Sequence, residues 1–300
     1  CAALWNLTVN DDKNRIAIAE EGGITTILSA MKNHFTNVDV QHYGCAALWN
    51  LTVNDDKNRI AIAEEGGITT ILSAMKTHSS NANVQHYGCG ALQNLALNND
   101  KNQVTIAEAG GIATILSAMT NCPKNADLQH YGCGALMNMA VDEKNKEMIA
   151  EAGGIDMILS AMKNHPENAH VQHYGCGALH NLAMRRENKG TIAVAEGIAT
   201  ILSAMMSPSS NAYVQLYGCA ALWTLAEYND DNKVMIIEAG GIATIQSAKE
   251  THPKISNVEH YVTLALRSLA YNNDNNQLMN ANAVGKVAIE SALPKCKKKV

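Results

Sequence analysis

The stretch DDKNRIAIAEEGGITTILSAMK at residues 55–76, followed by VQHYGCGALQNL at residues 84–95, decides the fold. The acidic and amide side chains that begin with Asp55 are typical of helix N-caps, so a short helix is predicted to start there. Gly66 and Gly67 are predicted to end that helix, because glycine adopts the left-handed conformation that closes a helix.

Two longer helices complete the pattern. After the glycine pair, apolar residues recur at i, i+3, i+4 and i+7, which is one face of a helix. They are Ile68, Ile71, Leu72 and Met75. A polar loop follows, and a third helix is predicted from near Val84 to near Leu97. No segment alternates apolar and polar residues as a strand would, so a β-propeller is excluded.

This unit of short, medium and long helices recurs along the chain. The cysteine of the YGC motif stands at positions 1, 45, 89, 133, 176 and 219, with Thr263 in the next place. The spacings are therefore 44, 44, 44, 43, 43 and 44 residues, and residues 1–32 are identical to residues 45–76. Helices that each carry an unburied apolar stripe must stack on their neighbours, so the repeats predict an α-helical solenoid.

The predicted architecture is a single all-α repeat domain over residues 1–300. It contains a partial repeat with a third helix only at 1–10, six full three-helix repeats at 11–271, a partial repeat at 272–295 and a basic tail at 296–300.

Composition and charge narrow the class of protein. The net charge is −5 and the pI is about 6.1, which argues against nucleic-acid binding, since such domains usually have a basic pI. No apolar run is long enough to span a membrane, and no signal peptide opens the chain. The recurrent cysteines lie in stacked helices, too far apart to form disulfides. We therefore expect an intracellular, cytoplasmic protein without integral membrane association.

NRIAIAEEGGITTILSAM followed by VQHYGCAALWNLT resembles the armadillo repeat, with its first helix, its glycine corner and its third helix ending in a leucine-flanked asparagine. The resemblance covers the whole chain. It implies a right-handed α-α superhelix whose third helices line a concave groove for extended peptides or partner proteins. It also implies that the recurrent asparagine hydrogen-bonds the backbone of the bound peptide.

Residues on the side of the third helix that faces away from the stack are the candidate binding residues. Positions three, four and seven apart share a helix face, and here they are His86, Tyr87, Gly90, Gln93 and Asn94. The asparagine recurs as Asn6, Asn50, Asn94, Asn138 and Asn181. An amide both donates and accepts, so this row suits an extended chain. The alternative is that each asparagine ties down its own helix end or a neighbouring loop.

The residue before each asparagine varies, whereas a tyrosine seven residues before it is constant. The variable residues are Trp5, Trp49, Gln93, Met137, His180, Trp223 and Arg267, and the constant ones are Tyr43, Tyr87, Tyr131, Tyr174, Tyr217 and Tyr261. A constant tyrosine combined with a variable residue one position before the asparagine would suit the recognition of different peptide side chains. The alternative is that the tyrosine packs between adjacent third helices.

One position departs from importin-like armadillo repeats, which carry a tryptophan four residues before the asparagine. Here that place holds Ala2, Ala46, Gly90, Gly134, Gly177, Ala220 and Leu264. Glycine inside a helix costs about 1 kcal/mol relative to alanine. We therefore expect either a neighbouring helix or a ligand to approach closely at the three glycines.

Catalytic and metal sites find no support in the sequence. His42, His86, His130 and His173 each precede a cysteine by three residues, but the cysteine is predicted to face the core and the histidine the open side, so no zinc site results. The chain has no phosphate loop and no nucleophile elbow. We predict no enzymatic activity, no metal and no cofactor.

The predicted function is that of a protein–protein interaction scaffold, which holds an extended peptide or partner segment in the groove. The alternative is a regulatory or positioning repeat arm of a larger signalling or enzymatic protein, such as one with kinase or GTPase domains. The predicted groove residues are Trp49, Asn50, Tyr87, Gln93, Asn94, Tyr131, Met137, Asn138, Tyr174, His180 and Asn181.

Overall fold

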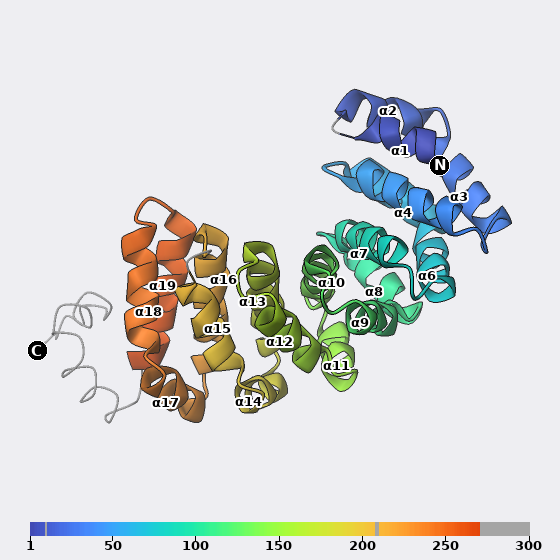
Figure 1. The fold of residues 1–300 in the computed structure, drawn as a ribbon. Helices are drawn as coiled ribbons and strands as arrows, with labels where there is room; N and C mark the ends of the chain where they lie inside the picture. Colours follow the sequence, from blue (N-terminus) through green and yellow to red (C-terminus); the bar gives the residue numbers. More distant parts are fainter. Residues whose placement is uncertain (10, 208–209, 271–300) are drawn as a thin grey trace, which may run out of the picture. The chain divides into compact units, whose positions relative to one another are not determined.

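The computed structural model describes residues 1–9, 11–207 and 210–270, and each regular element in those ranges is an α-helix (Figure 1). The prediction of an all-α armadillo-type solenoid is confirmed. The predicted partial repeat at 272–295 and the basic tail at 296–300 lie outside the described residues.

The helices fall into two compact units, the first from Cys1 to Asn164 and the second beginning at His165. The first unit contains α1 (Ala2–Thr8), α2 (Asp12–Glu20), α3 (Gly23–Asn33), α4 (Val38–Thr52), α5 (Asp56–Glu64), α6 (Gly67–Thr77), α7 (Ala82–Ala96), α8 (Asp100–Glu108), α9 (Gly111–Asn121), α10 (Ala126–Met139), α11 (Glu143–Glu151) and α12 (Gly154–Asn164). The second unit contains α13 (Ala169–Ala183), α14 (Arg186–Val194), α15 (Gly197–Met206), α16 (Ala212–Ala226), α17 (Asp230–Glu238), α18 (Gly241–Thr251) and α19 (Ser256–Ala270).

A three-helix period runs through this order. The helix α1 stands alone, and six groups of three follow, from α2–α4 to α17–α19. In each group the first helix has nine residues, the second ten or eleven, and the third fourteen or fifteen. The short, medium and long helices predicted from the sequence are therefore present along the described chain.

Local sequence accounts for where the helices begin and end. The Asp55 carboxylate accepts a hydrogen bond from the Asn58 backbone N–H at 2.9 Å and so caps the start of α5. Gly66 ends that helix with a φ of 80°, in the left-handed region that suits glycine. The chain then turns directly into α6 at Gly67.

A buried glutamine joins the second and third helices of a repeat. Gln85 Nε2 donates to the backbone oxygen of Met75 at 2.8 Å and to that of His78 at 3.0 Å. Both acceptors belong to the last turn of α6 and the residue that follows it, where helix carbonyls lack intrahelical partners. These two bonds therefore tie α7 to the C-terminal end of α6.

The core is built from the apolar stripes. In α7, Val84, Leu92 and Leu95 are fully buried. Cys45 and Cys89 occupy the same stripe in successive third helices, both are buried, and both are free thiols. Burial raises the pKa of the Cys45 thiol to about 12. These cysteines therefore act as small apolar core residues.

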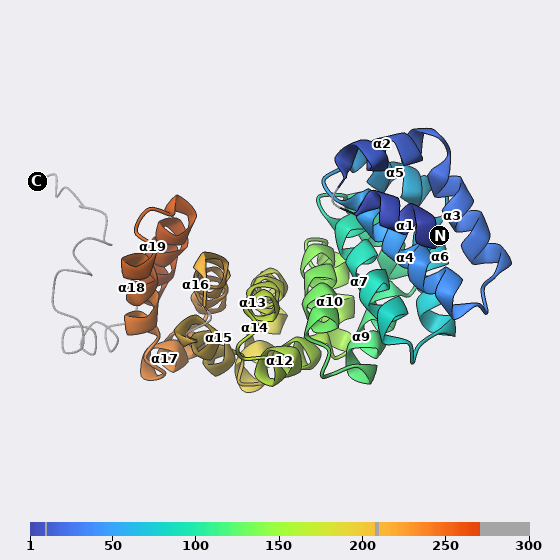
Figure 2. The ribbon, with the colours of Figure 1, turned by 45° about the horizontal axis from the view of Figure 1, so that its top comes forward.

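Third helices of neighbouring repeats pack against each other. In the first unit the order is α1, α4, α7 and α10, and in the second it is α13, α16 and α19 (Figure 2). One side of each row is covered by the first and second helices.

A single helix long and apolar enough to cross a bilayer is absent from the described residues. The pair Arg186–Val194 and Gly197–Met206 satisfies the length and composition criteria only when its two helices are joined, and it is bent by 73°.

Candidate functional site

Rings of histidine, tyrosine and tryptophan cover the side of α1, α4, α7 and α10 that the first and second helices leave uncovered. All of them are half-buried. We call these eight residues the third-helix face: Trp5, His42, Tyr43, Trp49, His86, Tyr87, His130 and Tyr131.

Histidine and tyrosine rings stack into a continuous ladder across this face. Within each helix the two rings are stacked, with centroids 4.4 Å apart for His42 and Tyr43 and 4.6 Å for His86 and Tyr87. Between helices, His42 stacks on Tyr87 at 5.3 Å, and His86 stacks on Tyr131 at 5.1 Å. The histidine of one repeat therefore bridges its own tyrosine and that of the next.

The tryptophans pack against the same ladder. The Trp49 ring lies 5.6 Å from Tyr87 and 5.3 Å from Tyr131, the latter in an edge-on arrangement. Trp5 contacts Tyr43 and Tyr87 at 5.4 and 6.3 Å. These tyrosines thus pack between adjacent third helices, and the tryptophans beside the asparagine, Trp5 and Trp49, rest on them.

The third-helix face has almost no charge. Among the residues of α1, α4, α7 and α10, only Asp39 and Asp127 are charged, and both are exposed in the first turn of their helices. Burial lowers the pKa of His42 and of His86, although Asp39 and Asp127 respectively oppose that shift. For both imidazoles the net shift favours the neutral form.

Two of the three glycines predicted to allow close approach, Gly90 and Gly134, receive side chains from the preceding repeat. A β-carbon placed on Gly134 would lie 2.6 Å from the Gln93 carboxamide carbon and nitrogen. One placed on Gly90 would lie 3.0 Å from Trp49 Nε1. Gln93 sinks into this space and is only 7% exposed, although the sequence places it on the open side. The close approach is therefore a contact between neighbouring repeats.

The asparagine row forms hydrogen bonds inside the stack. Asn50 and Asn94 each donate from Nδ2 to a threonine hydroxyl of the preceding third helix, Thr8 at 3.1 Å and Thr52 at 3.0 Å. Asn138 Nδ2 instead donates to the backbone oxygen of Gln93 at 2.9 Å. Each amide also has a second N–H and a carbonyl oxygen. These bonds join neighbouring third helices, whereas the alternative drawn from the sequence is a bond to the asparagine's own helix end or to a neighbouring loop.

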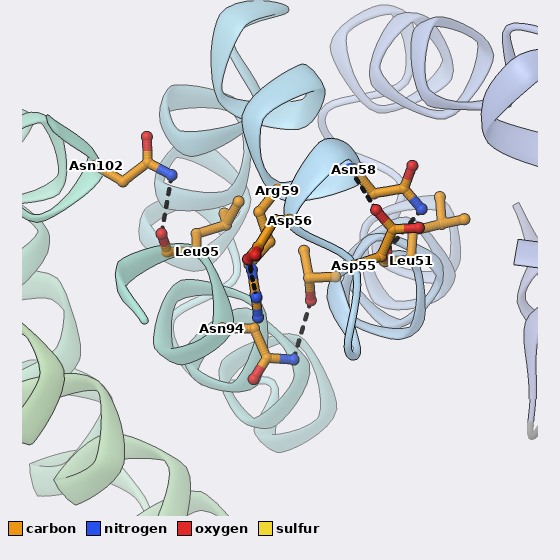
Figure 3. A network of polar contacts seen from close by, with 9 residues as sticks. Leu51, Asp55, Asp56, Asn58, Arg59, Asn94, Leu95 and Asn102 are labelled. Atoms are coloured by element: carbon orange, nitrogen blue, oxygen red, sulfur yellow. Dashed lines mark hydrogen bonds and ion pairs between the residues drawn. The ribbon is translucent and has the colours of Figure 1, made fainter. Parts of the chain in front are cut away.

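A row of basic residues in the first helices was not recognised from the sequence. Arg15 donates to the Thr8 backbone oxygen at 3.1 Å and pairs with Asp12. Arg59 pairs with Asp56 in the same way, and Figure 3 shows that pair together with Asn94. The recurrence of a base or glutamine at one place was the available signal: Arg15, Arg59, Gln103, Lys146, Lys189 and Lys233, all buried.

Within each of these pairs the acid neutralises the charge of the base. The base is largely buried and its acid is exposed: the side chain of Arg59 is 11% exposed and that of Asp56 is 81% exposed. Asn58 and Asn102 reinforce the same junction by donating to the backbone oxygens of Leu51 and Leu95 at 3.0 and 2.8 Å (Figure 3). The junction positions each third helix without leaving a net charge beside the third-helix face.

The second unit carries the remaining predicted residues, Tyr174, His180 and Asn181, on α13. The Tyr174 ring stacks on His173 at 4.2 Å, and His173 stacks on Tyr217 of α16 at 5.1 Å. Burial, with a smaller effect of His170, lowers the pKa of His173 to about 4.

His180 lies deeper than the sequence suggests. It is 7% exposed, and its Nδ1 lies 2.7 Å from Thr224 Oγ1 and 3.1 Å from the Ala220 backbone oxygen. Thr224 and Ala220 belong to α16 of the next repeat. Like Gln93, His180 therefore contacts the next repeat at the position occupied by a small residue.

The predicted groove residues are thus divided between the units. Eight of them lie on α4, α7 and α10 of the first unit: Trp49, Asn50, Tyr87, Gln93, Asn94, Tyr131, Met137 and Asn138. Within the described residues, no group of three or more histidine, cysteine, aspartate or glutamate side chains has an arrangement that could hold a metal ion.

Residues 24–198 match the family model described as the LRRK2 ARM repeat. No curated protein sequence matches the chain. Among solved structures, an engineered protein aligns with a TM-score of 0.76 at 24% identity, over 89% of this chain and 62% of its own length.

Two further structures share the fold. One, whose title concerns the interaction between cadherin and beta-catenin, aligns with a TM-score of 0.77 at 17% identity, over 93% of this chain and 50% of that one. The other is a designed armadillo repeat protein in complex with the peptide (KR)4, with a TM-score of 0.68 at 14% identity, over 81% of this chain and 98% of that one. The chain thus spans about half of the aligned chain in the structure whose title concerns cadherin and beta-catenin, and under two thirds of the engineered protein.

Proposed function

The chain belongs to the LRRK2 ARM repeat family, and we propose that it is a protein-binding scaffold whose third-helix face holds an extended segment of a partner protein. The observation that carries this proposal is the ladder of half-buried histidine and tyrosine rings across three adjacent third helices, α4, α7 and α10. The proposed role requires no chemical change in the partner.

Aromatic surface supports this role for a physical reason. Tyrosine and tryptophan bury a large rigid area at low entropic cost and keep a polar group at the edge of the ring. Trp49, Tyr87 and Tyr131 pack against one another, so their orientation is set before a partner binds. A preorganised surface loses less conformational entropy on binding than a mobile one.

The spacing of the helices also suits an extended segment. Third helices packed about 8–10 Å apart would meet an extended chain every two to three residues, given its rise of about 3.3 Å per residue. The designed armadillo repeat protein that binds (KR)4 is a structural neighbour, and its complex supports peptide binding by this fold.

A peptide selection with mapping by hydrogen exchange tests the proposal. The full chain is used to select from displayed random peptides of about 12 residues, long enough to cross four third helices when extended. Exchange of backbone amides is then compared with and without the peptide that is most enriched. We expect protection in α4, α7 and α10 with little change in the second helices α3, α6 and α9.

Protection confined to the second helices would show that the wrong side of the solenoid has been proposed. A selection that enriches no peptide would also count against the scaffold function. The variant Ser73→Ala, on the exposed side of α6, serves as the matched control, since it should leave affinity for the peptide unchanged.

A second candidate is a repeat arm that positions or restrains another part of a larger signalling or enzymatic protein. The match to the LRRK2 ARM repeat is consistent with this role. In that case the third-helix face would bind a segment of its own polypeptide. Sequencing the full-length transcript and testing the encoded protein for competition with the selected peptide would distinguish the two roles.

A further inference from the structure

Gln93 has a buried carboxamide oxygen that the fold leaves without a partner. The residue is 7% exposed, and its Oε1 has no hydrogen-bond partner. Two other glutamines, Gln103 and Gln215, also have an unpartnered Oε1, but both are held through Nε2, which donates to Ala96 O at 3.1 Å and to Met205 O at 2.6 Å respectively. Gln93 therefore differs, because neither atom of its amide is fixed by a hydrogen bond within the described chain.

An unpartnered buried amide is unfavourable for folding, since the group loses its hydrogen bonds to water and gains none. An apolar residue of similar size would fill the same space without that loss. The equivalent place in the two preceding third helices does hold apolar rings, those of Trp5 and Trp49. The fold alone thus gives no reason for glutamine at this position.

The surroundings of Gln93 belong to the proposed binding surface. Its side chain rests on Gly134 of α10, and its backbone oxygen accepts the hydrogen bond from Asn138. One repeat earlier, the equivalent residue Trp49 packs against Tyr87 and Tyr131. Gln93 therefore places a hydrogen-bonding group where the two preceding third helices carry tryptophan.

Charge decides what kind of partner fits there. The helix α7, which carries Gln93, has no charged residue, and the nearby base Arg59 is already paired with Asp56. A partner side chain with a full charge would lose its hydration at this surface, and α7 itself offers no opposite charge. An uncharged segment does not incur that loss.

Resting on the proposed scaffold function, we propose that Gln93 is a polar subsite of the third-helix face, which hydrogen-bonds an amide group of an uncharged, extended partner segment. The last torsion of glutamine is broad, so its carboxamide can turn to present either atom. A peptide group then supplies both an N–H for Oε1 and a carbonyl oxygen for Nε2. Gly134, which has no β-carbon, leaves the space that the Gln93 carboxamide occupies.

The test uses the full chain and the most enriched peptide from the random selection described above. Gln93→Met keeps the length of the side chain and removes its hydrogen-bonding groups. The matched control is Gln103→Met, which removes another buried glutamine with an unpartnered oxygen, but in the first helix α8. Affinity is measured by titration, and thermal unfolding is measured on the same samples.

We expect selected peptides to be depleted in charged residues relative to the unselected library. Gln93→Met should weaken binding at least about fivefold, because the partner amide loses its hydrogen bonds, while its unfolding temperature stays the same or rises. Gln103→Met should bind as the unchanged chain does.

Each contrary result has a distinct meaning. Enrichment of charged peptides, or equal affinity of Gln93→Met and the unchanged chain, would overturn the subsite and leave the scaffold function standing. Weaker binding together with an equal loss of stability would show that Gln93 acts through the fold, which also overturns the subsite. Failure to enrich any peptide would overturn the scaffold function and the subsite with it.

Discussion

The Ile62 backbone oxygen closes over Gly67, so a β-carbon placed on that glycine would lie only 2.6 Å away from it. The obstacle is backbone and cannot move aside as a flexible side chain would. We expect Gly67→Ala to destabilise the chain by about 1–3 kcal/mol, in the range of an overpacked core. Urea unfolding followed by circular dichroism measures this directly.

Gly190 provides the control for that substitution. It lies inside the helix α14, is exposed, and a β-carbon placed on it would meet nothing within 4 Å. Gly190→Ala should therefore stabilise the chain by about 1 kcal/mol, which is the difference in helix propensity. Similar losses from both substitutions would mean that the corner at Gly67 tolerates a side chain.

Asn94 should contribute to stability through its bond to Thr52. Removing the amide in Asn94→Ala leaves the Thr52 hydroxyl without its 3.0 Å partner, which we expect to cost about 0.5–1.5 kcal/mol. Asn6 holds the same place in α1 but is exposed, so Asn6→Ala should change stability little. Equal stability of the two variants in urea would show that the asparagine row does not tie the repeats together.

These residues show which features the sequence could predict. The cap at Asp55 and the corner at Gly66 depend on neighbours within a few positions, so local patterns were sufficient. The bond between Asn94 and Thr52 joins residues 42 apart, and it depends on how one repeat is set against the next. No local pattern fixes that register.

The same limit applies to the candidate site. Gln93 was predicted on the open side because helix periodicity places it there, yet it sinks onto Gly134 of the following repeat. The glycine was recognised as a point of close approach, but the side chain that fills it was not. The buried row that includes Arg15 and Arg59 was missed because charged side chains are ordinarily assigned to solvent.

Acid should destabilise the second unit through His173. Its pKa is lowered from 6.5 to about 4 in the folded chain, so the unfolded chain binds more protons across that interval. Stability is therefore fully present above pH 6.5 and is lost as the pH falls toward 4. Melting temperatures measured through this range should show the loss.

The variant His173→Phe is the control for the pH effect. Phenylalanine can stack on Tyr174 and Tyr217 as the imidazole does, but it takes up no proton. The dependence of melting temperature on pH should be shallower in this variant. An unchanged dependence would assign the effect to other groups, including His42 and His86, whose pKa values are also lowered by burial.

Arg186 should destabilise the start of α14. In α11 and α17 the buried lysine pairs with an acid three residues earlier, Lys146 with Glu143 and Lys233 with Asp230. In α14 that place holds Arg186, and Lys189 Nζ donates only to the Glu227 backbone oxygen, at 2.6 Å.

Burial is the main cause that lowers the pKa of Lys189, and Arg186 lowers it further, although Glu227 acts in the opposite direction. Arg186→Asp replaces a repulsive charge by an acid at a helix N-terminus, where negative charge is favourable. We expect a gain of about 0.3–1 kcal/mol in the free energy of unfolding. The reciprocal change Asp230→Arg in α17 should cost a similar amount, because Lys233 would lose its acid and gain a like charge. If Arg186→Asp leaves stability unchanged while Asp230→Arg reduces it, the Glu227 carbonyl alone is enough to hold Lys189.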